Sequence, residues 1–116
     1  MTTDTDKIGT KLSADVRANR VFFTRHALAE LVEDQITTEK VLEALVFVRV
    51  LENYAQHQRG ACRLVAGLTT KGRWLHAVCT TSRPETLVIT VYVPTLPRCQ
   101  ASKEFANNRH VAVKVI

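Results

Sequence analysis

Four side chains in this 116-residue chain are suited to proton transfer and phosphate binding: His26, His76, Arg63 and Tyr92. Imidazole titrates near neutral pH, so a histidine can act as a general base or a general acid. The planar guanidinium of an arginine matches the oxygens of a phosphate. A phenol can donate a proton or orient a phosphate. These residue types therefore suit the cleavage of a phosphate ester.

Each of these residues also has an ordinary structural interpretation. Surface arginines are common, so Arg63 could be a solvated strand residue. His76 could be a half-exposed strand residue without a role, and Tyr92 could cover the end of a sheet. His26 lies just after Thr24, in the first turn of a predicted helix, where the helix dipole disfavours a positive imidazole. A neutral His26 could act as a base, or it could simply bond to a nearby backbone group.

A second set of residues could contact a nucleic acid: Lys71, Arg73, Trp74, Thr90 and Arg109. Lys71 and Arg73 flank a predicted turn and could be either a basic rim or solvated turn residues. Trp74 could stack on a base, bind a partner protein or cover the sheet edge. Thr90 is more typical of a β-strand former than of a nucleophile, and Arg109 lies in a basic C-terminal stretch.

Composition favours a polyanionic partner and disfavours a metal or cofactor. The net charge is +5 and the pI is about 9.5, which attracts polyanions. The aromatic content of 6% is low for a platform of several base-stacking rings. Cys62, Cys79 and Cys99 have no paired spacing, so free thiols are expected, with the first two in the core. The chain has no C-x-x-C or H-E-x-x-H motif, so we expect no metal and no cofactor.

The chain length suits one domain, and the sequence lacks membrane signals. No apolar run approaches the ~20 residues that span a bilayer, and the polar N-terminus does not resemble a signal peptide. We therefore expect a cytoplasmic protein that does not enter a membrane. Residues 1–12 lack periodicity, so we expect a flexible N-terminal lead-in followed by a single α+β domain over 13–116.

The periodicity of apolar residues predicts helices followed by strands. Thr24 can cap a helix that runs to about Glu33, Thr37 or Thr38 can cap a second, and a short turn could begin at Ser13. The period then changes to two, which predicts strands at 48–54, 61–69, 73–81 and 86–94 and a possible fifth at 110–116. This order predicts an α+β fold, with two or three helices on one face of a four- to five-stranded antiparallel sheet.

The turn before Trp74 decides which side chains share a face of the sheet. If Lys71 and Gly72 are the two central residues of a tight hairpin, Thr70 pairs with Arg73. Alternation then directs Leu64, Ala66 and Leu68 toward the helices. The open face would carry a cation, an imidazole, a hydroxyl and a phenol: Arg63, His76, Thr90 and Tyr92.

The order of several short motifs resembles the domain-of-unknown-function family 4258. The stretches "FTRHALAELVEDQITTEKVLEAL", "CRLVAGLTTKGRWLHAVC" and "LVITVYVP" carry the resemblance, which covers about residues 20–95. The matching residues include His26, Arg63, His76 and Tyr92, and Phe105 with Arg109 fits a later F-x-x-x-R. One position departs from the pattern, because "EDQI" has Asp34 where the family has an arginine. This departure could weaken a site.

The family is similar to RelE-like and MqsR-like ribonuclease toxins. The resemblance implies a RelE-like fold and a metal-independent endoribonuclease toxin of a toxin–antitoxin pair, which cleaves RNA by attack of a 2′-hydroxyl. Its partners would be RNA and a cognate antitoxin-like protein. His26 or His76 would act as base or acid, Arg63 would stabilise the phosphate, and Tyr92 would orient it or donate a proton. The alternative is a non-catalytic basic module of the same fold that binds protein or RNA. An exposed last strand could also pair two chains in a homodimer.

Overall fold

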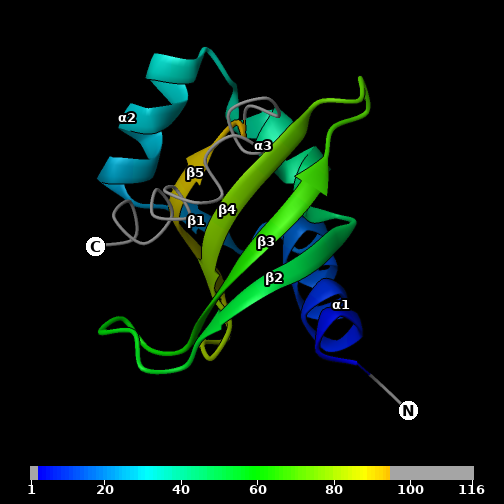
Figure 1. Cartoon of the computed structure of the whole chain (residues 1–116), viewed down its shortest axis with the longest axis vertical. Coiled ribbons are helices and arrows are strands. Elements are labelled where there is room, and N and C mark those ends of the chain that lie inside the picture. The colour runs from blue at the N-terminus through cyan, green and yellow to red at the C-terminus, as the bar shows by residue number, and fades with distance from the viewer. Residues whose placement is uncertain (1–2, 95–116) are drawn as a thin grey trace, which may run out of the picture.

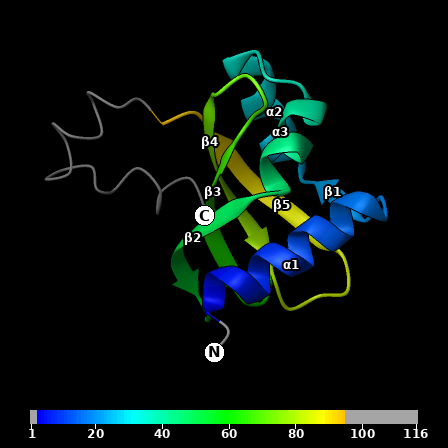
Figure 2. The same cartoon turned by 90° about the vertical axis from the view of Figure 1, so that its right-hand side faces the viewer.

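The computed structural model describes residues 3–94, which form three helices and a five-stranded sheet (Figure 1). The helices lie together on one side of the sheet, so the molecule has two layers (Figure 2). The strand order is β1-β5-β4-β3-β2. The α+β class expected from the sequence is therefore confirmed.

The first helix, α1 (Asp4–Arg17), begins nine residues before the turn expected at Ser13. Thr3 and Asp6 form a capping box, in which the Thr3 side chain accepts from the backbone nitrogen of Asp6. Ile8 and Leu12 are one turn apart and are buried in the core. Most of the expected lead-in is thus helix. The sequence pattern missed it because these two apolar residues are widely separated by polar ones.

The second and third helices agree with the predicted caps. In α2 (Arg25–Asp34) the side chain of Thr24 accepts from the backbone nitrogen of Ala27 at 3.0 Å. In α3 (Thr38–Leu45) Thr37 caps in the same way. A threonine hydroxyl satisfies one of the amide groups that the first turn leaves without a partner. Thr24 also donates to the carbonyl oxygen of Ile89, which fixes the start of α2 beside the sheet.

Four predicted strands are confirmed: β2 (Val48–Tyr54), β3 (Cys62–Leu68), β4 (Trp74–Thr80) and β5 (Thr86–Tyr92). They pair in an antiparallel manner. A short strand, β1 (Val21–Phe23), pairs parallel with β5, so the expectation of a purely antiparallel sheet is wrong. The sequence did not reveal β1, because a strand of three residues is too short to show an alternation of apolar and polar side chains. The possible strand at 110–116, with the homodimer contact inferred from it, lies outside the described residues.

The register of the β3–β4 hairpin differs by one residue from the prediction. Thr69, not Thr70, pairs with Arg73, because the loop has three residues and Gly72 has a φ of +83°. The Gly72 amide donates to the carbonyl oxygen of Thr69, as in a turn closed by a glycine bulge. A one-residue slip exchanges the two faces of a strand. Every side chain of β3 therefore lies on the face opposite to the one predicted.

The main core lies between the helices and the sheet. Its sheet side chains come from β3, β4 and β5, and the β5 pair lies on either side of a bulge: Val65, Leu75, Ala77, Cys79, Val88 and Val91. Gly67 lies on the same face, where α3 comes so close that an added Cβ would be 2.2 Å from the carbonyl oxygen of Ala44. A smaller apolar cluster, Cys62, Leu64, Val78 and Ile89, lies on the other face.

Candidate functional site

Polar side chains gather on the sheet face opposite α1, α2 and α3, which we call the helix-free face. The strand pairings align Arg49 with Ala66, Ala66 with His76, and His76 with Tyr92, which places four residues in one row across β2, β3, β4 and β5. The pairing Val78–Thr90 defines the next row, where Val78 belongs to the apolar cluster of this face. His76, Thr90 and Tyr92 therefore share the helix-free face, as predicted.

His76 and Tyr92 form a hydrogen-bonded pair on this face. Nδ1 of His76 lies 3.1 Å from the hydroxyl oxygen of Tyr92, and the two rings meet edge to face with centroids 5.3 Å apart. Burial lowers the pKa of His76 from its usual value of 6.5, because the protonated ring is poorly solvated there. His76 is therefore neutral at pH 7. If Nδ1 carries the proton and donates it to Tyr92, the lone pair of Nε2 is free to accept a proton.

His26 belongs to a second polar group, which is centred on Glu30 of α2. Nε2 of His26 lies 3.4 Å from Oε2 of Glu30, and the histidine is exposed while the acid is buried. The other carboxylate oxygen, Oε1, accepts from the backbone nitrogen of Val91 at 2.9 Å and from the hydroxyl of Thr90. Glu30 thus binds the edge of β5 beyond the end of β1 and holds His26 beside it.

β5 connects the two polar groups. Thr90 contacts Glu30, Tyr92 contacts His76, and the two β5 residues are two positions apart on the same face, roughly 7 Å along the strand. His26 approaches this part of β5 from α2, and His76 approaches it from β4. Two imidazoles therefore flank one strand, and the polar side chains of Thr90 and Tyr92 lie between them.

Arg63 does not belong to this group, and its predicted place on the open face is wrong. It pairs with Cys79, a core residue under the helices, so its side chain lies on the helix-covered face. Its guanidinium binds both carboxylate oxygens of Asp4 in α1 at 3.0 Å and donates to Thr81 at 2.8 Å. The hydrogen bond from Arg63 lowers the pKa of Asp4. The contacts of Arg63 join α1 to the sheet.

The remaining predicted residues lie in different places. Lys71 and Arg73 are exposed in the hairpin loop, on either side of Gly72. Trp74 lies on the helix-free face beside Leu68, and both side chains are more than 40% exposed. Arg109 lies outside the described residues. Cys62 and Cys79 are both buried free thiols, and burial raises the pKa of Cys79 to about 12, so neither is poised as a nucleophile.

Sequence reasoning missed two polar residues, Glu30 and Arg49. Glu30 lies one turn after His26 and between Ala27 and Leu31 on the buried side of the helix, so an acid within the apolar stripe was the available signal. Arg49 was overlooked because its place on the sheet depends on the β2–β3 register and on the bulge between Val50 and Glu52. No local motif encodes that register.

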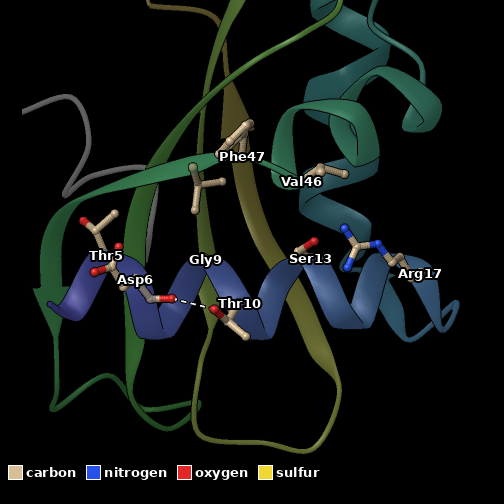
Figure 3. Close-up of a pocket in the computed structure, with 9 residues that line it drawn as sticks. Thr5, Asp6, Gly9, Thr10, Ser13, Arg17, Val46 and Phe47 are labelled. Carbon is tan, nitrogen blue, oxygen red and sulfur yellow. Dashed lines mark hydrogen bonds between the residues drawn. The ribbon is translucent and has the colours of Figure 1, made fainter. Parts of the chain in front are cut away.

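A pocket lies away from these groups, between α1 and the junction of α3 with β2 (Figure 3). The exposed Phe47 and its neighbours form one wall, and polar residues of α1 form the other. The charged residues in its lining are Asp6 and Arg17, and Asp6 already serves in the capping box of α1. The pocket therefore lacks the paired titratable groups found along β5.

Comparison with known proteins identifies a family but no function. Residues 23–93 match the family described as a domain of unknown function, DUF4258. The chain therefore belongs to this family, as the resemblance in the sequence indicated. No curated protein and no solved structure shows significant similarity.

Residues 3–94 contain no cluster of three or more histidines, cysteines or acids placed to hold a metal ion. Within the same range, no helix combines the length and the apolar character required to cross a membrane.

Proposed function

We propose that the protein is a metal-independent endoribonuclease that cleaves RNA by attack of a 2′-hydroxyl on the adjacent phosphate. The observation that carries this proposal is the position of two imidazoles on either side of β5, His76 from β4 and His26 from α2. Such cleavage needs one base and one acid on opposite sides of the reacting phosphorus, and it needs no metal.

His76 serves as the base in this proposal. Its lowered pKa keeps it neutral, and its hydrogen bond to Tyr92 fixes the orientation of the ring. Nε2 takes the proton of the 2′-hydroxyl as the 2′-oxygen forms its bond to phosphorus. The bond from phosphorus to the 5′-oxygen then breaks, and the product strand ends in a 2′,3′-cyclic phosphate.

His26 serves as the acid. It is exposed, so it can reach the leaving 5′-oxygen and give it a proton, which yields a free 5′-hydroxyl. The carboxylate of Glu30, 3.4 Å from Nε2 of His26, positions the ring at the start of α2. Tyr92 lies beside His76, where its hydroxyl group can donate a hydrogen bond to a phosphate oxygen, whereas the buried Thr90 donates to Glu30 and so helps to hold that acid beside His26.

The biological role that we propose is that of a toxin with a RelE-like or MqsR-like fold, whose partner is an antitoxin-like protein. The family resemblance and the arrangement of helices on one face of a sheet support this assignment. An antitoxin would inhibit the enzyme by covering the helix-free face, where Trp74 and Leu68 offer exposed apolar surface.

The reaction can be tested with the purified full-length chain in excess EDTA. We expect it to cut an RNA oligonucleotide into products with cyclic phosphate and 5′-hydroxyl ends. It should leave intact the same oligonucleotide with a 2′-deoxy substitution at the cut position. A His26→Ala/His76→Ala double variant purified identically controls for contaminating nucleases. Equal cleavage by this variant, or cleavage of the deoxy substrate, contradicts the proposal.

A non-catalytic binding module is the second candidate, and the exposed pair Leu68 and Trp74 favours it. Induced expression in a bacterial host separates the two functions. A ribonuclease toxin should arrest growth, and the histidine double variant should not. A bare binding module should not arrest growth, so normal growth of cells that express the wild-type chain would favour it.

A further inference from the structure

Arg49 is an exposed cation in the same row as the His76–Tyr92 pair. It pairs with Ala66 across β2 and β3, and Ala66 pairs with His76 across β3 and β4. Two strand spacings, about 10 Å, separate the backbones of Arg49 and His76. The only side chain between them in this row is the methyl group of Ala66. The guanidinium can therefore extend toward the imidazole without a larger side chain in the row to block it.

The guanidinium of Arg49 is also uncommitted. Among residues 3–94 it makes no hydrogen bond and no ion pair, whereas Arg63 and Arg20 each bind an acid. The acid of β2 on the same face, Glu52, accepts a hydrogen bond from the hydroxyl of Tyr54 at 2.5 Å. Burial and this carboxylate raise the pKa of Tyr54, so the phenol stays protonated and continues to donate. Glu52 is thus held by Tyr54 and does not neutralise Arg49.

We infer that Arg49 binds the phosphate on which the His76–Tyr92 pair acts, and so supplies the cation that Arg63 does not. A phosphate above Ala66 would lie between the guanidinium and the imidazole, where the fork of the arginine can bind two of its oxygens. The identification of the ligand as an RNA phosphate rests on the proposed ribonuclease function. The anion site itself rests on the position of Arg49 alone.

The inference can be tested by binding without cleavage. The probe is a fluorescein-labelled single-stranded DNA oligonucleotide, which has the phosphates of RNA but no 2′-hydroxyl. Anisotropy titrations compare the wild-type chain with Arg49→Ala, Arg49→Lys and the matched control Arg17→Ala, which removes the same charge from α1. Thermal melting of each variant confirms that it is folded.

We expect Arg49→Ala to weaken binding by about tenfold or more, as the loss of a charged hydrogen bond does. Arg49→Lys should lose less affinity for the oligonucleotide, and the Kd of Arg17→Ala should stay within about twofold of the wild-type value. The slope of log Kd against log salt should fall by about 0.7 in Arg49→Ala, the value for one phosphate contact on a single strand. Glu52→Gln should tighten binding, because it removes a negative charge from the same face.

Three results would overturn the inference: no binding by the wild type at low salt, wild-type affinity in Arg49→Ala, or equal losses in Arg49→Ala and Arg17→Ala. These results are distinct from a failure of the proposed function. A chain that binds the DNA through Arg49 but never cleaves RNA retains the anion site and loses the ribonuclease assignment. A chain that cleaves RNA at the same rate with and without Arg49 retains the ribonuclease assignment and loses the anion site.

Discussion

At the scale of the residue, Glu30 is the side chain on which the site depends most. One carboxylate oxygen accepts from Val91 and Thr90, and the other faces His26. The strand edge that Glu30 covers would otherwise expose an amide without a partner, since β1 ends before this point. Glu30 thus supplies the hydrogen-bond acceptor for the open edge of β5 and also positions the imidazole of His26.

Replacement of Glu30 by alanine should lower stability. The buried amide of Val91 and the buried hydroxyl of Thr90 lose their acceptor, at a cost of about 1–3 kcal/mol for each buried donor left unsatisfied. Urea unfolding measures the change. Glu33→Ala on the exposed side of the same helix should stay within about 0.5 kcal/mol of the wild type. If both variants lose the same stability, Glu30 does not hold the strand edge.

The residue types of the site could be predicted better than their grouping. The chemistry of a side chain follows from its residue type, so the sequence alone identifies the imidazole, hydroxyl and phenol groups of His26, His76, Thr90 and Tyr92. Thr90 and Tyr92 were also placed on the correct face. Arg63 was predicted on the wrong face because the loop between β3 and β4 is one residue longer than expected. Its partner, Asp4, lies in α1, a helix that the sequence pattern did not reveal. Long-range contacts of this kind have no local signal.

At the scale of the element, the β3–β4 hairpin determines which residues meet. The caps at Thr24 and Thr37 and the bounds of four strands followed from the sequence, because local propensity and periodicity determine them. The hairpin register did not follow, since Thr70, Lys71 and Gly72 allow either a two-residue or a three-residue loop. The three-residue loop places Gly67 beneath α3 and Ala66 beside Arg49.

A pair of glycine substitutions tests this register. Gly67→Ala should destabilise the protein by roughly 1–3 kcal/mol or more, because the new Cβ meets the backbone of Ala44. Gly9→Ala should stabilise it by about 0.5–1 kcal/mol, because Gly9 lies inside α1 and its nearest neighbour would be 4.0 Å away. Thermal and urea unfolding give both values. A harmless Gly67→Ala would support the register with Gly67 on the open face and refute the register with Gly67 beneath α3.

At the scale of the whole molecule, a buried acid joins α1 to the sheet. Asp15 accepts from Lys11 and from Thr86 at 2.7 Å each and from Arg20 at 3.2 Å. Burial by itself would raise the pKa of Asp15, but the hydrogen bonds from Lys11, Thr86 and Arg20 and the charge of Lys11 outweigh it. The pKa is therefore lowered below 3.8.

Three of the five net positive charges lie in residues 95–116, so the described part is nearly neutral.

The lowered pKa of Asp15 predicts a pH dependence of stability. Since the folded pKa is below the unfolded one, the contribution of Asp15 is complete above about pH 4 and is lost as the pH falls through the folded pKa. Asp15→Asn should therefore flatten the fall in stability below pH 4, and it should lower stability at pH 7. Asp34→Asn, which removes an acid without an ion pair in residues 3–94, is the control. Identical acid profiles for the wild type and Asp15→Asn would contradict this role.

The central claim is that His26 and His76 act together across β5, and three single histidine variants test it most directly. The rate of RNA cleavage in EDTA is measured for His26→Ala, His76→Ala and His57→Ala. The last residue lies in the turn after β2, where its Nδ1 accepts from the backbone nitrogen of Arg59. We predict losses of about 10²–10⁴-fold for His26→Ala and His76→Ala and a wild-type rate for His57→Ala. Wild-type rates in all three variants, or equal losses in all three, would contradict the claim.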